Sequence, residues 1–185
     1  MKRFREYLTE AKGIGSIENL KRVIDNHDKV YILFAGTLGA GKSYFAKMHL
    51  PHVKVIDPDE IAVAMVGVDK AREAGAKAMA MKQKAVSDAL ETEQKFAEMG
   101  TSGNTQAALN KLERAKKAGF TTIFIFISTD PETAKERNRF RIAGGDRGVP
   151  PEKEWKIDVM HDKAMATAKE VRDCRDLDYF FSVRT

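Results

Sequence analysis

The chain has 185 residues, of which 43% are hydrophobic and 32% are charged, and this is typical of one globular domain spanning residues 1–185. Its apolar runs fall short of the ~18 residues that a membrane span requires. The charged opening MKRFREYLTE is unlike a signal peptide, and a single cysteine excludes an intrachain disulfide, so we expect a cytoplasmic protein with no membrane partner. A net charge of +5 and a pI of about 9.2 fit either an anionic partner or an ordinary lysine-rich surface.

The first third of the chain predicts helices flanking two short strands. Residues 1–27 are expected to form two short helices, broken at the glycine-containing stretch 13–15. Residues 29–35 form a continuous apolar run rich in β-formers, typical of a strand buried on both faces. Residues 53–56 are a second, shorter run of this kind. Residues 43–50 between them favour a helix.

The middle of the chain is rich in helix formers. Residues 60–91 predict one long helix, and residues 94–99 a short strand. Residues 105–118 are amphipathic and predict another helix. The long helix carries an apolar stripe that favours core packing over a ligand groove, formed by Ala78, Met79, Ala85, Val86, Ala89 and Leu90.

Residues 121–128 are the strongest strand of the sequence. Asp130 and Pro131 are typical of the cap and first position of a helix, which should run to about residue 142. Residues 151–172 predict a further helix, and residues 179–183 a last strand. Strands that alternate with helices favour a three-layer α/β fold with a parallel sheet.

Residues 36–43, GTLGAGKS, match the phosphate-binding P-loop pattern G-x-x-x-x-G-K-[ST] between a predicted strand and a predicted helix. The glycines let backbone N–H groups point at phosphate oxygens, and the positive end of the helix favours the same charge. Lys42 is expected to reach the β- and γ-phosphates of ATP, and the Ser43 hydroxyl to bind Mg²⁺. The expected nucleotide-binding residues are Gly36, Thr37, Leu38, Gly39, Ala40, Gly41, Lys42, Ser43 and Tyr44.

GTPases, motor ATPases and kinases share this loop, so the following residues must separate them. The sequence lacks the base-reading [NT]-K-x-D element of a GTPase, and residues 53–57 come too soon after the loop to serve as a motor ATPase's acidic strand. Asp57 and Asp59 follow the second strand, at the sheet edge where ligands of such folds bind. Either carboxylate alone could be a helix cap, but beside a P-loop they suit a kinase, which needs a carboxylate to orient its acceptor.

A basic segment follows the strongest strand. Arg137 and Arg141 are four residues apart and share a helix face, while Arg139 and Arg147 lie close by in the sequence. The glycine-rich stretch 141–150 suggests a lid, and we place a lid region at about residues 131–155. Lid arginines can stabilise the charge of a transferred phosphoryl group, although a solvated basic helix would show the same pattern.

Over residues 29–150 the chain resembles the zeta-toxin and polynucleotide-kinase group of small P-loop kinases. The resemblance implies a central strand order of 2-3-1-4-5, Asp59 as catalytic base, and Asp57 as an indirect Mg²⁺ and substrate contact. It also implies acceptor contacts by Glu98, Thr101 and Ser102. Arg137 and Arg141 match the catalytic lid positions of the group, and Arg147 stands where its lid histidine usually is. The opening residues also resemble those of large-phage proteins, which would imply a host cytoplasm.

The expected function is an ATP- and Mg²⁺-dependent kinase that phosphorylates a hydroxyl of a nucleic acid or nucleotide. A 5′-end hydroxyl or a hydroxymethylated DNA base would suit, with Arg139, Arg147 or both meeting phosphates of a polymeric acceptor. One alternative is a zeta-toxin-like kinase acting on a nucleotide sugar. Another is a nucleotide-dependent switch with slow ATP hydrolysis. The oligomeric state stays open.

Overall fold

The computed structural model describes residues 7–9, 17–67, 70–71, 73–145 and 148–185. Its elements, in chain order, are β1 (Tyr7–Thr9), α1 (Ile17–Asp25), β2 (Val30–Ala35), α2 (Lys42–His49), β3 (Lys54–Ile56), α3 (Pro58–Val66), α4 (Gly75–Thr92), β4 (Lys95–Glu98), α5 (Thr105–Lys117), β5 (Thr121–Ser128), α6 (Pro131–Ala143), the 3₁₀ turn η1 (Pro151–Lys153), α7 (Trp155–Arg172) and β6 (Tyr179–Arg184). Within these ranges, no helix combines the length and the apolar character of a membrane span.

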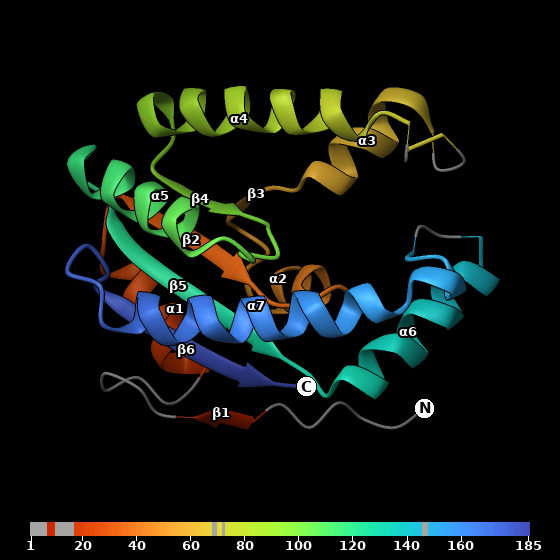
Figure 1. The fold of residues 1–185 in the computed structure, drawn as a ribbon. Coiled ribbons are helices and arrows are strands. Elements are labelled where there is room, and N and C mark those ends of the chain that lie inside the picture. Colours follow the sequence, from red (N-terminus) through yellow and green to blue (C-terminus); the bar gives the residue numbers. More distant parts are fainter. Residues whose placement is uncertain (1–6, 10–16, 68–69, 72, 146–147) are drawn as a thin grey trace.

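The strands form one sheet in the order β1-β6-β5-β2-β4-β3 (Figure 1). The five strands β2 to β6 are all parallel, and β1 pairs antiparallel with β6 at one edge. Counted along the chain, the parallel strands have the order 2-3-1-4-5. The predicted fold class and strand order are therefore confirmed.

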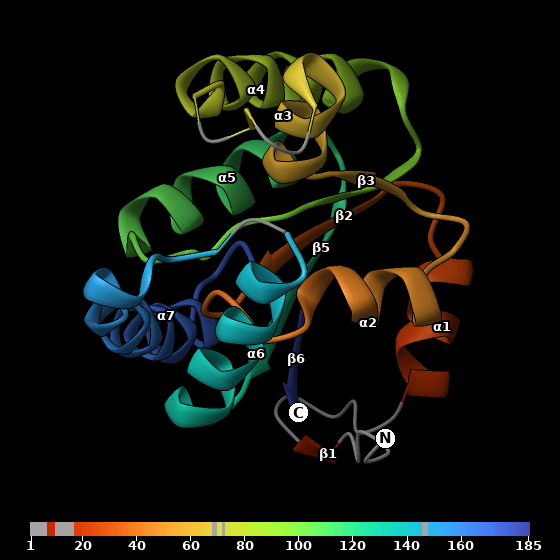
Figure 2. The same cartoon turned by 90° about the vertical axis from the view of Figure 1, so that its right-hand side faces the viewer.

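Helices cover both faces of the sheet and make the three layers (Figures 1 and 2). Buried side chains of α4, α5 and α7 form one core with one sheet face, and side chains of α1 and α2 form a second core with the other. The central strands β2 and β5 are buried along both faces, which explains their continuous apolar runs. Helices α3 and α6 lie beyond the carboxyl ends of the strands. The site is built at that edge.

Two predictions about helices were wrong. Tyr7–Thr9 form a strand, because the open edge of β6 offers them a hydrogen-bonding partner along Ser182–Arg184. The predicted long helix over residues 60–91 is two helices, because Gly67 ends α3 with a positive φ of 80°. The two pieces pack through buried alanines, namely Ala62, Ala71, Ala74 and Ala78.

Candidate active site

The loop between β2 and α2 needs glycine at two positions for reasons of packing. Gly36, Gly39 and Gly41 all have φ values between 79° and 142°. A Cβ atom on Gly36 would lie 2.3 Å from the backbone oxygen of Ile127, and one on Gly39 would lie 2.8 Å from that of Ala134. The loop is therefore pressed against the end of β5 and the first turns of α6, which fixes its shape.

Lys42 curls back over this loop. Its Nζ donates to the backbone oxygens of Gly36 and Thr37, both at 2.8 Å. Burial lowers the pKa of Lys42 to about 8, although the carboxylates of Asp57 and Asp59 favour its charged form. The loop thus holds a cation where the phosphate-binding pattern expects one.

Ser43 and Asp57 bring oxygen ligands together at the start of α2. The Ser43 hydroxyl donates to Asp57 Oδ2 at 3.2 Å, while Asp57 Oδ1 accepts from the backbone N–H of Asp59 at 2.8 Å and caps α3. Mg²⁺ takes oxygen ligands and in nucleotide sites uses few protein groups, so this pair fits it. No cluster of three or more His, Cys, Asp or Glu side chains occurs in the described ranges, so phosphates and water would complete the shell.

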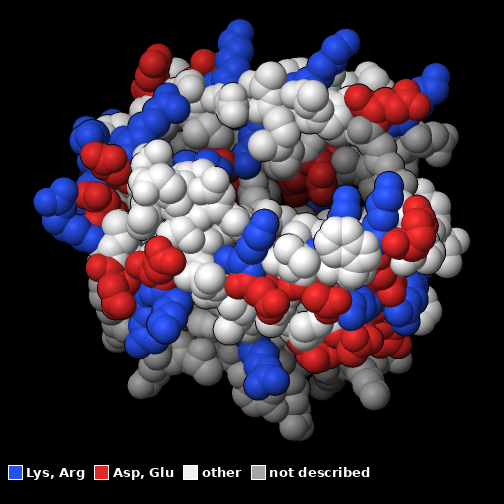
Figure 3. All heavy atoms as spheres, viewed as in Figure 1, with Lys and Arg blue, Asp and Glu red and all other residues white. Residues whose placement is uncertain are grey.

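These groups open into a cleft of about 840 Å³. Figure 3 shows a hollow on this side of the molecule, with Lys and Arg interspersed among Asp and Glu around it. The cleft lies between the loop, α3, α4 and α6, and its lining includes Leu38, Gly39, Gly41, Lys42, Ser43, Tyr44, Asp57, Asp59, Met79, Lys82, Thr101, Arg137 and Arg141. The structure therefore brings together the loop, the two aspartates and two of the arginines that the sequence assigned to a lid.

Arg137 is hydrogen-bonded to the backbone of the loop. Its Nη1 donates to the backbone oxygen of Gly39 at 3.1 Å and to Thr185 Oγ1 at 3.2 Å. The hydroxyl of Thr185 in turn donates to the backbone oxygen of Ala40 at 3.0 Å. Burial beside the loop lowers the pKa of Arg137, because the charged guanidinium loses contact with water. Arg141 lines the same cleft, so the two predicted lid positions share it.

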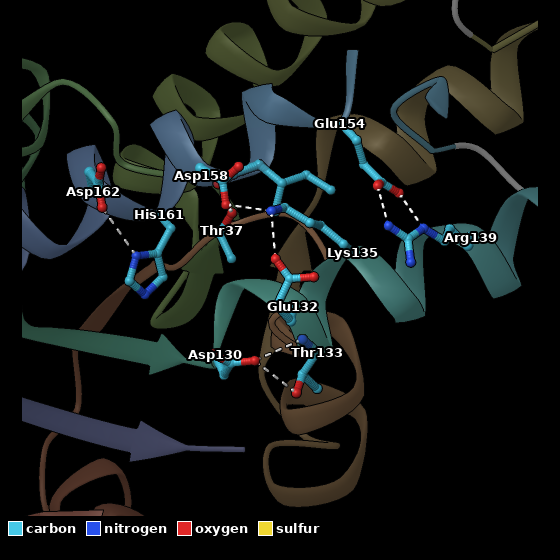
Figure 4. A network of polar contacts seen from close by, with 11 residues as sticks. Thr37, Asp130, Glu132, Thr133, Lys135, Arg139, Glu154, Asp158, His161 and Asp162 are labelled. Atoms are coloured by element: carbon cyan, nitrogen blue, oxygen red, sulfur yellow. Dashed lines mark hydrogen bonds and ion pairs between the residues drawn. The ribbon is translucent and has the colours of Figure 1, made fainter. Parts of the chain in front are cut away.

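Arg139 lies elsewhere. Its guanidinium makes two hydrogen bonds with the carboxylate of Glu154, the one from Nε to Oε1 being 2.9 Å long (Figure 4). It does not line the cleft. Arg147, the other arginine expected to meet the acceptor, lies outside the described residues.

Polar contacts hold α6 against α7. The Lys135 ammonium bridges Glu132 and Asp158, each at 2.8 Å (Figure 4). The buried amide of Asn138 donates to the backbone oxygen of Val149 and accepts from its N–H, both at 2.7 Å. Asn138 therefore ties α6 to Val149 in the segment that follows it, a role that its place between two arginines did not indicate.

Thr37 faces away from the cleft. It is buried, and its hydroxyl donates to the backbone oxygen of Ile157 in α7 at 3.3 Å. Its side chain therefore couples the loop to α7, and only its backbone is available to the loop's concave side.

Glu98 at the end of β4 is buried behind the cleft wall and does not line it. Its Oε2 accepts from the Tyr31 hydroxyl at 2.7 Å, and its Oε1 pairs with Lys82 at 2.8 Å and with Lys111 at 2.6 Å. Burial acts to raise the pKa of Glu98, but the two ammonium groups outweigh it and hold that pKa below its usual value. Glu98 is thus placed to act through Lys82.

The segment after β4 turns sharply beside the loop. Thr101 lines the cleft, and its backbone oxygen accepts from the N–H of Gly36 at 3.4 Å. Ser102 has a φ of 49°, a left-handed conformation that is energetically unfavourable for any residue other than glycine. Its hydroxyl donates to the Phe34 backbone oxygen at 3.4 Å. Thr101 therefore faces the cleft, while Ser102 shapes the turn.

Sequence reasoning missed Lys82. Lys82 is four positions from Ala78 and four from Val86, so it lies on the buried stripe of α4, where a lysine is out of place. Burial lowers the pKa of Lys82, although Glu98 favours its charge. Met79, assigned to the core from the sequence, is 45% exposed and lines the cleft. This face of α4 is therefore a cleft wall as well as core.

Comparison with known proteins agrees with this architecture. The family model described as an AAA domain matches residues 32–163. No similar protein was found among the curated sequences. A candidate kinase from Chloroflexus aurantiacus superposes with a TM-score of 0.61 at 18% identity, covering 86% of this chain and 87% of the other.

Two further solved structures share the fold. A chain of the PezAT chromosomal toxin–antitoxin system of Streptococcus pneumoniae has a TM-score of 0.66 at 15% identity, covering 90% of this chain and 73% of its own. A chain of the Pnkp1/Rnl/Hen1 RNA repair complex has a TM-score of 0.62 at 14% identity, covering 78% of this chain. This protein spans about half of that longer chain, 47%. At these identities the likeness shows the fold.

Proposed function

Because the chain belongs to the AAA domain family and has a P-loop kinase-like fold that binds nucleotide, we propose that it is an ATP- and Mg²⁺-dependent kinase. Its acceptor is a hydroxyl of a nucleic acid or nucleotide. The observation that carries the proposal is the single cleft shared by Lys42, Asp59 and Arg141. A phosphate-binding cation, a candidate base and a lid cation around one space are what transfer to a hydroxyl requires.

Each group has a role in this reaction. The loop N–H groups and Lys42 hold the phosphates of ATP, and Asp59 orients the acceptor hydroxyl and takes its proton. The acceptor oxygen bonds to the γ-phosphorus as the bond to the β-phosphate oxygen breaks, which releases ADP. Arg137 and Arg141 stabilise the charge on the transferred group. Mg²⁺, held by Ser43 and indirectly by Asp57, would neutralise phosphate charge.

The nucleic-acid or nucleotide acceptor is supported by the net charge of +5 and by the fold shared with a chain of an RNA repair complex. The acceptor side of the cleft comprises Thr101, Met79 and Lys82, which offer a hydroxyl, an apolar surface and a cation. A 5′-end hydroxyl or a hydroxymethylated base would fit these groups.

A nucleotide sugar is the second candidate acceptor. Two observations favour it: Arg139 is engaged with Glu154 away from the cleft, and charges of both signs alternate around the hollow in Figure 3. A long polyanion would meet repulsion from the acidic groups there. The fold shared with a toxin–antitoxin component agrees with this second candidate.

The test is transfer of labelled γ-phosphate to DNA and RNA ends, hydroxymethylated DNA, nucleotides and nucleotide sugars. A kinase makes a labelled acceptor, whereas a nucleotide-dependent switch makes only ADP and phosphate. Lys42→Ala is the inactive control. Binding through many phosphates weakens steeply with salt, so acceptor affinity at two ionic strengths separates a polymer from a small molecule. Release of phosphate alone with every acceptor would refute the kinase proposal.

A further inference from the structure

A lysine of α4 is enclosed in the wall of the cleft. The Lys82 side chain is 4% exposed, and Lys82 lines the cleft together with Met79 and Thr101. Its Nζ donates to the backbone oxygen of Met99 at 2.6 Å and pairs with Glu98 at 2.8 Å. An ammonium has three donors. Within the part of the chain that the structure describes, the third has no protein acceptor.

Charges of both signs surround Lys82, because the carboxylates of Glu98 and Asp57 and the ammonium of Lys111 all act on it. Glu98 serves two lysines through Oε1, Lys82 at 2.8 Å and Lys111 at 2.6 Å, and gives Oε2 to Tyr31. The Glu98 carboxylate is thus shared by two cations and a hydroxyl, and Asp57 adds a second negative charge that acts on Lys82. Lys111 is 38% exposed, so water can solvate it, whereas Lys82 is enclosed. Of the two ammonium groups that share Glu98, the enclosed one therefore lines the cleft.

A purely structural role explains this arrangement poorly. Burying a lysine–glutamate pair costs desolvation that its attraction barely repays, and apolar residues at such positions often stabilise as well or better. Leaving one N–H of a buried cation without an acceptor adds to that cost. An anionic oxygen delivered by a ligand would satisfy this donor.

We propose that Lys82 binds a phosphate oxygen of the acceptor, and so selects acceptors that carry a phosphate near the hydroxyl to be phosphorylated. This inference rests on the proposed kinase function. ATP has its own cations in Lys42, Arg137 and Arg141, which line the same cleft, so we assign Lys82 to the acceptor. Met79, 45% exposed on the same wall, offers an apolar surface for a base or sugar. Glu98 is then a positioning residue that holds Lys82.

The test compares acceptors that differ by one phosphate. Transfer rates are measured for a nucleoside, its 3′-monophosphate, a 5′-hydroxyl oligonucleotide and a nucleotide sugar, with wild-type protein, Lys82→Met and Lys84→Met. Lys84 is an exposed lysine of the same helix and serves as the matched control. Loss of one hydrogen bond to a charged group should lower kcat/KM for the phosphate-bearing acceptors about 10- to 100-fold. The nucleoside, the KM for ATP and the control variant should be unaffected.

Some results would overturn the assignment. An equal loss for nucleoside and nucleotide, or a rise in the KM for ATP alone, would mean that Lys82 is structural or serves ATP. If Lys82→Met does not fold, the wild-type protein decides: equal KM values for the nucleoside and its 3′-monophosphate overturn the proposal. If Lys82→Met lowers transfer to the oligonucleotide, the phosphate belongs to a nucleic acid. If it lowers transfer to the nucleotide sugar, the phosphate belongs to that small molecule.

Calorimetric titration of the same acceptors separates this inference from the kinase proposal. If the wild-type protein binds phosphate-bearing acceptors without phosphorylating them, and Lys82→Met weakens that binding, the kinase proposal alone is refuted and the phosphate site is supported. Wild-type protein that binds none of the phosphate-bearing acceptors refutes the phosphate site.

Discussion

The depressed pKa of Lys42 makes nucleotide binding depend on pH in a range where an ordinary lysine would not. Burial lowers this pKa to about 8, and phosphate needs the ammonium form. Roughly nine-tenths of the protein carries the charge at about pH 7, and roughly one-tenth at about pH 9. Affinity for ATP should therefore fall about tenfold over this interval, or about 1.4 kcal/mol. A bound phosphate raises the pKa again, so binding takes up a proton.

Calorimetry of ATP binding in two buffers with different heats of ionisation measures both effects. Uptake of about half a proton is expected near the pKa of about 8, with little uptake a unit or more below it. Phosphate groups are already ionised there, since their second pKa is about 6. Lys42→Met removes the titrating group, so its weaker binding should not vary with pH. Equal wild-type affinities at the two ends of the interval, or a variant with the wild-type slope, would refute the reasoning.

Three further substitutions test the site. Asp59→Asn should keep ATP binding and lose transfer by about 10²-fold or more, and Asp57→Asn should be milder; reversed severities in the rate assay would exchange their roles. Gly36→Ala places a Cβ 2.3 Å from the Ile127 backbone oxygen at a positive φ, so ATP binding should be lost and thermal unfolding should show a cost of about 1–3 kcal/mol or more. Thr185→Val removes the hydroxyl beside Arg137, so kcat should fall while the KM for ATP changes little; an unchanged kcat would mean that Arg137 needs no such support.

Local signals predicted most of the fold. Asp130 caps α6 and is followed by Pro131, as the sequence indicated. The pairing of Tyr7–Thr9 could not be predicted, because three residues form a strand only where another strand leaves its edge open. The end of α3 at Gly67 was also missed, because the helix propensities of the surrounding residues outweigh that of a single glycine.

Some residues of the candidate site could likewise be predicted from the local sequence, and others could not. The loop and its lysine follow from contiguous residues, whereas Lys82 and Thr185 enter through contacts between distant parts of the chain. Thr185 meets Ala40 across 145 positions. Arg137 and Arg139 are neighbours on one helix with different surroundings, and no composition or spacing separates the arginine on the loop from the one paired with Glu154.

Helix α7 joins parts of the molecule that the chemistry would have to coordinate. It accepts a hydrogen bond from Thr37 of the loop, pairs with α6 through Lys135, and meets α5 where the hydroxyls of Thr105 and Thr167 are 2.9 Å apart. A shift of the loop on phosphate binding would therefore be transmitted through α7 to α6, the helix that carries Arg137 and Arg141. Amide hydrogen exchange along α7 should then slow when nucleotide is added, which reports engagement of the loop before any acceptor is known.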